Sequence, residues 1–196
     1  MKYFLDLTHP VGDNTIQWPT ATKFKVLKAV ASQFDDYYYE SRDISTAEHA
    51  GTHTDAPAHF CRDRWHTADI PLTRLTGPGV KIDIEQRVET DPDTDLLVED
   101  ILAWQRRHGD IPEKSVVVVH TGRGKLYGEK RKYFGRPDTI TDERDVANLH
   151  FPGVSPAAAQ WLVDHDVVGV AIDTPSTDRG QSKTFPTHQV LCQVRI

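Results

Sequence analysis

The stretch HAGTHTDAPAHF, residues 49–60, brings three imidazoles and one carboxylate together, with glycine and proline shaping the backbone between them. Imidazole nitrogen and carboxylate oxygen are the ligand types that zinc favours, and the same set suits manganese or iron. A single histidine is ordinarily a solvated surface residue, so a polar loop is the alternative interpretation. Four candidate ligands in one short window indicate a divalent metal site instead.

The backbone of this stretch is predicted to be extended and not helical. His49 and His53 are four residues apart and would share one face of a helix, as in helical HExxH sites. Gly51, the β-branched threonines and Pro57 all disfavour that helix. We therefore predict a strand that bends at Gly51 and runs into a turn, with His49, His53 and Asp55 on the same side of the strand.

Length and composition limit the class of protein. The chain has 196 residues without an internal repeat or a low-complexity segment, which predicts a single domain spanning residues 1–196. The net charge is −6 and the basic residues are scattered among acids, which argues against nucleic acid as a partner.

The sequence also bears on the compartment in which the protein acts. An acid at Asp6 interrupts the N-terminus before a signal-peptide core, and no apolar run reaches transmembrane length. We expect a cytoplasmic protein with no membrane partner. Cys61 and Cys192 are too few for a disulfide framework and are predicted to be free thiols.

Hydrophobic periodicity predicts β structure in the first half of the chain and alternating strands and helices in the second. Strands are predicted over residues 3–8, 23–30, 37–44, 79–84, 116–119 and 167–172. Helices are predicted over residues 97–108, ended by Gly109, and 156–164, capped by Ser155 and burying Ala159, Leu162 and Val163. Residues 123–145 are predicted to form a surface excursion, and residues 178–187 a flexible loop. This pattern indicates a mixed α/β fold.

Residues 49–60 resemble the HxGTHxDxPxHF signature of the metal-dependent cyclase-type hydrolases, a family that includes bacterial kynurenine formamidases and isatin hydrolases. Shorter similar motifs follow in order along most of the chain: DLTHP at 6–10, QWP at 17–19, HTG at 120–122, FPGVS at 151–155, AIDTPS at 171–176 and TH at 187–188. The resemblance implies a swivelling β/β/α fold, in which a mixed, barrel-like β-sheet packs against flanking helices.

The resemblance also implies roles for individual residues. The implied metal ligands are His49, His53, Asp55 and His188. Asp55 would bridge from the first metal to a weaker second site at His188, and His59 would be the general base and then the general acid. Trp18 and Phe60 would contact an aromatic substrate; the alternative for Trp18 is a position at the edge of the core.

The implied activity is hydrolysis of an amide C–N bond by a homodimer or a higher homo-oligomer. Zinc is the first expected ion and manganese the second, because either can lower the pKa of bound water to about 7 while polarising the carbonyl oxygen. The favoured substrate is an N-formyl arylamine such as N-formylkynurenine. The alternative substrate is a cyclic amide of the isatin type.

One departure from the family pattern concerns residues after His188. Similar proteins have a metal-binding glutamate roughly a dozen residues downstream, whereas residues 189–196 contain no acid, and the family's final strands are also missing. We therefore expect the second metal site to be weak. The departure also leaves open a metal-containing binding or scaffold protein with little or no turnover.

The substitution His53→Ala should remove bound metal and leave the fold largely intact. The predicted ligand lies outside the buried strands at 116–119 and 167–172, so its loss should cost little folding free energy. Elemental analysis of the purified protein, with circular dichroism to confirm folding, measures both. Full metal content in a folded His53→Ala protein would exclude His53 as a ligand.

Overall fold

The structure is a computed structural model that describes residues 5–193 and is a mixed α/β protein with both parallel and antiparallel strand pairs. Its backbone contacts define two compact units, Met1–Thr54 and Asp55–Ile196, and each is described by itself. Two expectations from the sequence stay predictions: that residues 1–196 form a single domain, and that the protein is a homo-oligomer.

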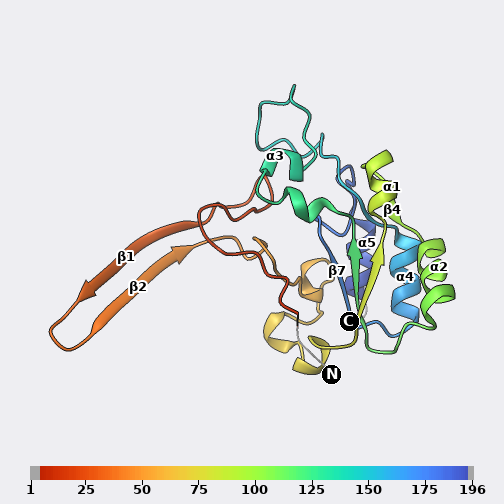
Figure 1. Ribbon diagram of the computed structural model, residues 1–196, viewed down its shortest axis with the longest axis horizontal. Helices are drawn as coiled ribbons and strands as arrows, with labels where there is room; N and C mark the ends of the chain where they lie inside the picture. The colour runs from red at the N-terminus through yellow and green to blue at the C-terminus, as the bar shows by residue number, and fades with distance from the viewer. Residues whose placement is uncertain (1–4, 194–196) are drawn as a thin grey trace. The chain divides into compact units, whose positions relative to one another are not determined.

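The first unit contains one antiparallel hairpin, formed by β1 (Lys25–Gln33) and β2 (Tyr38–Ser45) (Figure 1). Val30 pairs with Ser41, and the register shifts between Val26 and Lys28, which marks a β-bulge. These strands confirm the prediction over residues 23–30 and 37–44. The strand predicted over residues 3–8 is wrong where it can be assessed, because residues 5–8 are irregular and exposed; residues 3 and 4 lie outside the described part.

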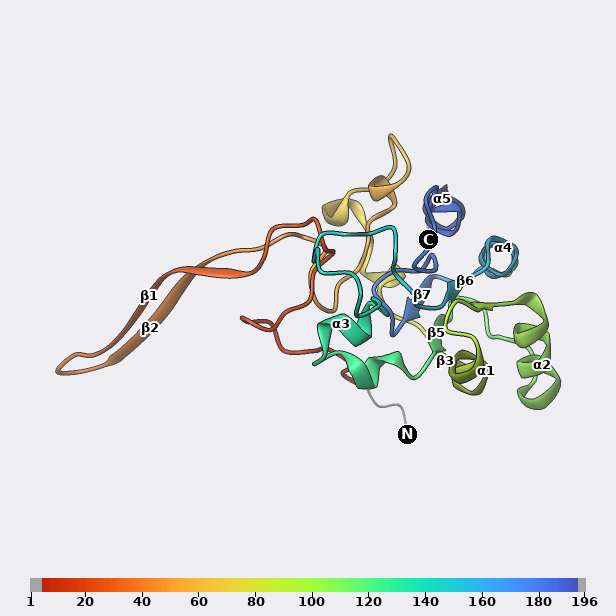
Figure 2. The ribbon, with the colours of Figure 1, turned by 90° about the horizontal axis from the view of Figure 1, so that it is seen from above.

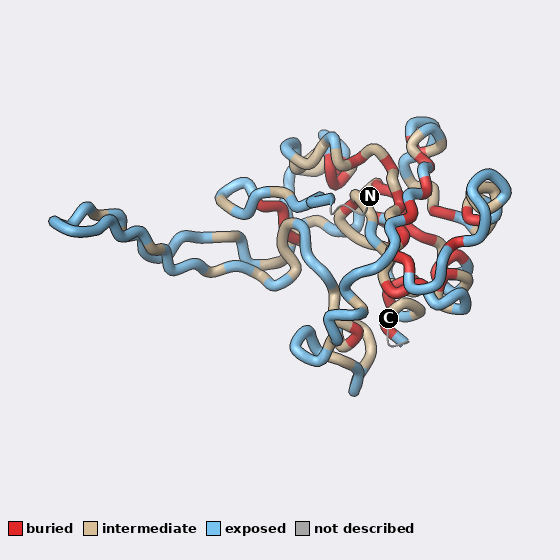
Figure 3. Tube along the Cα trace, turned by 60° about the horizontal axis from the view of Figure 1, so that its bottom comes forward, coloured by how far each residue is buried: buried red, intermediate tan, exposed pale blue. Residues whose placement is uncertain are grey.

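The hairpin has no buried residue, as Figure 3 shows by its pale blue and tan colouring. Its alternating sequence favours extended backbone, but two strands alone cannot enclose apolar side chains. Exposed aromatic residues therefore remain near its turn, among them Phe34, Tyr37 and Tyr38.

The second unit is organised around a parallel sheet in the order β3 (Gly79–Asp83), β5 (Val116–His120) and β7 (Gly169–Ile172). β5 is the central strand, and Val117 and Val119 are completely buried. A central parallel strand is covered on both faces, which is why its sequence is a continuous β-branched run. The predicted strands at 79–84, 116–119 and 167–172 are confirmed with small differences at their ends.

Helices, which Figure 2 shows from above, and a second short sheet complete this unit. The remaining elements are α1 (Glu85–Thr90), β4 (Asp95–Leu96), α2 (Val98–His108), α3 (Lys130–Tyr133), β6 (Gly153–Val154), α4 (Pro156–Asp164) and α5 (Pro186–Gln193). β4 and β6 pair in parallel. The short 3-10 helices are η1 (Pro57–His59), η2 (Thr67–Asp69), η3 (Leu72–Arg74) and η4 (Arg123–Leu126).

The two predicted helices form because their ends carry the expected signals. Ser155 Oγ accepts the Ala158 backbone N–H at 3.2 Å, and Pro156 occupies the first turn of α4. Gly109 ends α2 with a φ of 88°, a conformation that glycine adopts without a side-chain clash. α1 was not predicted from the sequence. Its six residues contain a single buried apolar side chain, Val88, and one apolar position cannot show the periodicity by which a helix is recognised.

The hydrophobic core joins the parallel sheet to α1, α2 and α4. Its buried members are Val80, Ile82, Ile84, Val88, Leu96, Ile101, Ile111, Val117, Val119, Val154, Ala158, Ala159, Leu162 and Val167. The predicted burial of Ala159 and Leu162 is confirmed, whereas Val163 is only partly buried.

Three other expectations need correction or stay open. Residues 123–145 are not only a surface excursion, because Tyr133 and Phe134 are buried and the Arg123 guanidinium donates to the Tyr133 carbonyl. The predicted flexible loop at 178–187 begins with a buried aspartate, Asp178. Within residues 5–193 the strands form separate sheets and do not close, so the barrel-like and swivelling details are not confirmed.

Membrane insertion by a helix finds no support in residues 5–193, where every helix is too short or too polar to span a bilayer.

The substitution Leu162→Ala should destabilise the second unit by about 2–5 kcal/mol, because it leaves a cavity where the side chain is completely buried. Its neighbour on the same helix, Val163, is the matched control. Val163→Ala should cost on the order of 1 kcal/mol, since Val163 is partly exposed. Urea denaturation followed by fluorescence measures both; equal losses would contradict the assigned orientation of α4.

Candidate functional site

The metal-motif stretch crosses the boundary between the two units, with His49 and His53 in the first and Asp55 and His59 in the second. Within the first unit, the His49 and His53 rings lie edge to face, with centroids 5.2 Å apart. His53 Nδ1 lies 2.9 Å from the Gly51 carbonyl oxygen. Because a carbonyl oxygen only accepts, Nδ1 of His53 carries a proton.

The backbone of residues 49–54 is neither helix nor strand. Gly51 has a φ of 62° and donates its N–H to the Ile16 carbonyl at 2.7 Å, so the chain bends there as predicted. Ala50 forms an isolated bridge with Gln17. The exclusion of a helix is confirmed, whereas the predicted strand is wrong, because the bend leaves room for only one bridge.

In the second unit, Asp55 and His59 flank the proline that begins η1. Ligand atoms of these two residues lie within 4.8 Å of each other. Pro57 is buried and the His59 N–H donates to the Ala56 carbonyl, so a tight turn brings the two side chains together. Asp55 is half-buried and His59 is exposed.

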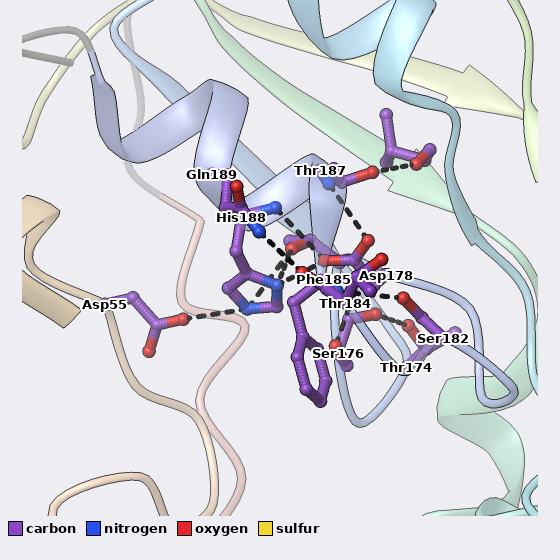
Figure 4. Close-up of polar contacts among 12 residues, drawn as sticks. Asp55, Thr174, Ser176, Asp178, Ser182, Thr184, Phe185, Thr187, His188 and Gln189 are labelled. Carbon is purple, nitrogen blue, oxygen red and sulfur yellow. Dashed lines mark hydrogen bonds and ion pairs between the residues drawn. The ribbon is translucent and has the colours of Figure 1, made fainter. Parts of the chain in front are cut away.

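His188 lies far along the sequence but meets Asp55 in space (Figure 4). It belongs to α5, and its residue is 8% exposed. His188 Nε2 lies 3.4 Å from Asp55 Oδ2. The structure therefore brings together three of the predicted site residues of the second unit: Asp55, His59 and His188.

The distance between His188 Nε2 and Asp55 Oδ2 fits two ligands of one metal ion. Two ligand atoms bound at about 2.1 Å to one tetrahedral zinc ion lie about 3.4 Å from each other. The Asp55 and His188 atoms have this spacing, and one is a carboxylate oxygen and the other an imidazole nitrogen. The donor pair therefore suits a divalent ion in both geometry and chemistry.

Asp178 holds the other side of the His188 ring. Its Oδ2 lies 2.5 Å from His188 Nδ1, and the residue is only 3% exposed. Burial acts to lower the pKa of His188, but the hydrogen bonds that its ring donates to Asp178 and Asp55 outweigh burial and raise that pKa to about 8. Sequence reasoning missed Asp178, because ten residues separate it from His188 and only the fold closes that distance.

Aromatic side chains border the same histidine. The Phe60 ring lies 4.4 Å from the His188 ring and 5.4 Å from the Phe185 ring, measured between centroids. The His59 ring lies 4.6 Å from that of Phe60. Phe60, predicted to contact substrate, thus lies beside the candidate metal ligands, whereas Trp18 belongs to the first unit and is partly exposed.

A second group of possible ligands lies where β3 and β5 end. One atom each of Asp83, Glu85 and His120 lie within 4.8 Å of one another. Their carboxylates already have cationic partners, because Lys81 Nζ lies 2.9 Å from Asp83 Oδ2 and Lys125 pairs with Glu85. A metal ion there would have to displace both ammonium groups, so this group fits a metal less well than Asp55 and His188.

The substitution His120→Ala should therefore leave the metal content of the protein unchanged. The ring nitrogen Nδ1 of His120 is engaged by Asp83 at 3.0 Å, and the neighbouring carboxylates are neutralised by lysine. Elemental analysis after dialysis measures the metal content. Loss of one equivalent of metal in His120→Ala would place an ion at this second group.

Comparisons with known proteins find similarity to two hydrolases. The chain is 28% identical to isatin hydrolase of Roseibium aggregatum, over 95% of this chain and 74% of that protein. It is 22% identical to kynurenine formamidase of Salinibacter ruber, over 98% of this chain and 78% of that protein.

Solved structures with a similar fold also include hydrolases. An isatin hydrolase bound to the product analogue thioisatinate matches with a TM-score of 0.81 and 28% identity, over 96% of this chain and 75% of that one. A predicted metal-dependent hydrolase of Bacillus stearothermophilus matches with a TM-score of 0.60 and 25% identity, over 96% and 77%. The Cyclase family model matches residues 5–179, and the chain belongs to the Cyclase family.

Proposed function

We propose that this protein is a metal-dependent hydrolase that cleaves the C–N bond of an aryl amide. The observation that carries the proposal is the buried His188 imidazole, whose Nε2 faces Asp55 Oδ2 at the separation expected of two ligands on one ion. Similarity to an isatin hydrolase, to a kynurenine formamidase and to a predicted metal-dependent hydrolase supports it.

The proposed ligands follow the sequence motif. His49, His53 and Asp55 hold the first ion, and Asp55 with His188 holds a second, weaker one. Covalent connectivity alone keeps the Cα atoms of His53 and Asp55 within about 7 Å. Zinc is the first candidate and manganese the second, and either ion, when bound, supplies acidified water and an electrophile for the amide carbonyl.

His59 is the proposed catalytic acid–base residue. It is exposed, and its ring centroid lies 6.0 Å from that of His188, so its imidazole can reach solvent and substrate beside the ligands. A neutral imidazole accepts the proton of the attacking water and returns it to the departing amine nitrogen. Phe60 gives the second unit an aromatic surface for an aryl ring, and we assign Trp18 the same role in the first unit.

The proposed substrate is an N-formyl arylamine such as N-formylkynurenine, and the second candidate is a cyclic amide of the isatin type. The second candidate is favoured by a specific observation, the TM-score of 0.81 to an isatin hydrolase. Turnover of both substrates by the metal-loaded protein, with an unsubstituted lactam as the negative control, decides between them. Absence of turnover with either would favour a metal-containing binding protein.

The substitution His59→Ala should lower turnover by roughly 100-fold or more, because it removes the group that transfers the proton, while metal content is retained. His120→Ala, which replaces the histidine of the separate Asp83, Glu85 and His120 group, is the matched control and should retain activity. Steady-state kinetics and elemental analysis on the same preparations test both parts. Loss of metal in His59→Ala would instead make His59 a ligand.

A further inference from the structure

The Asp178 carboxylate is one of the most buried charged groups described in the second unit, and it accepts hydrogen bonds from the start of α5. Oδ1 accepts the Thr187 backbone N–H at 2.9 Å, and Oδ2 accepts the His188 backbone N–H at 3.1 Å. Oδ2 also lies 2.5 Å from His188 Nδ1 (Figure 4). One carboxylate therefore caps the helix and holds the side chain of its third residue.

The bond to the ring fixes which nitrogen carries the proton. An ionised carboxylate only accepts, so Nδ1 must be the protonated nitrogen of His188. Three N–H groups point at this carboxylate, and hydrogen bonds of that kind stabilise its ionised form. Nε2, which faces Asp55, is then the nitrogen at which a metal ion can replace a proton.

A helix cap alone does not require this arrangement. Capping is complete with the two backbone N–H groups, and a carboxylate there is further stabilised by the helix dipole. The third bond, to the ring, adds nothing to capping. The Thr177 hydroxyl lies 3.3 and 3.4 Å from the two ring nitrogens and does not select between them, so the choice of tautomer falls to Asp178.

We infer that Asp178 is a positioning residue, which holds His188 with its proton on Nδ1 and presents Nε2 to a metal ion shared with Asp55. The inference rests on the proposed metal-dependent function, because it concerns the ion that His188 would bind. Phe60 packs against the same ring, with the two centroids 4.4 Å apart. Carboxylate partners of ligating histidines raise the basicity of the ligand and fix its orientation.

The variant Asp178→Asn separates the two roles of this residue. The amide oxygen still accepts a backbone N–H at the start of α5, but the NH₂ group donates to Nδ1 and shifts the ring proton to Nε2. We expect Zn²⁺ affinity at the weaker site to fall about 10–100-fold. Zn²⁺ titration by calorimetry measures the affinity, and ¹⁵N-resolved NMR of the His188 ring measures the tautomer.

The variant Thr187→Val is the matched control for lost stability. Thr187 Oγ1 donates to the Val154 carbonyl at 2.5 Å, so valine removes a buried hydrogen bond at the adjacent residue without touching the ring. We expect lower thermal stability with an unchanged tautomer and unchanged Zn²⁺ affinity. If Thr187→Val and Asp178→Asn lose Zn²⁺ affinity equally, Asp178 has only a structural role and the inference is wrong.

A measurement on the unsubstituted protein keeps the inference testable if Asp178→Asn does not fold. In the Zn²⁺-loaded protein, the ¹⁵N shifts of His188 should show a proton on Nδ1 and zinc on Nε2. A proton on Nε2 overturns the inference even if amide turnover is normal. The assigned tautomer with no turnover of any amide would instead overturn the proposed hydrolase and leave the role of Asp178 intact.

Discussion

Parallel pairing of β5 between β3 and β7 is the constraint on which the second unit depends. A central parallel strand exposes apolar side chains on both faces, so chain segments must return across the sheet and cover it. Because the strands are parallel, their carboxyl ends lie at the same edge of the sheet, and the segments that follow the strands begin there. Asp178 lies six residues beyond β7, so its place beside α5 follows from this topology and not from local sequence.

The electrostatics of the candidate site follow from two carboxylates on either side of one buried imidazole. Asp178 faces Nδ1 and Asp55 faces Nε2, so positive charge on the ring is favoured by a carboxylate on each side. Without metal, a proton on His188 supplies that charge, as its raised pKa indicates. A divalent ion between Asp55 and Nε2 can take the place of the proton. The arrangement is therefore suited to a cation whichever substrate the protein hydrolyses.

The candidate site also differs from the other ionic cluster of the same unit in how its charges are balanced. Asp83 and Glu85 have lysine partners supplied by the chain itself. Asp55 and Asp178 both lie against His188, which can exchange its proton for a metal. The presence of acids and histidines alone does not distinguish the two clusters; the nature of their cationic partners does.

The sequence by itself determined the features that depend on neighbouring residues. The β-branched run at 116–119 specified a buried strand, Ser155 and Pro156 specified the start of α4, and residues 49–60 indicated metal chemistry from side-chain type and spacing. Tertiary structure alone decided what depends on distant contacts. It placed His188 in a helix, buried Asp178 against it, and filled part of residues 123–145 with core aromatics. The physical reason is that hydrogen bonds across ten or more residues form only after the sheet has brought the segments together, and no local pattern encodes such a distance.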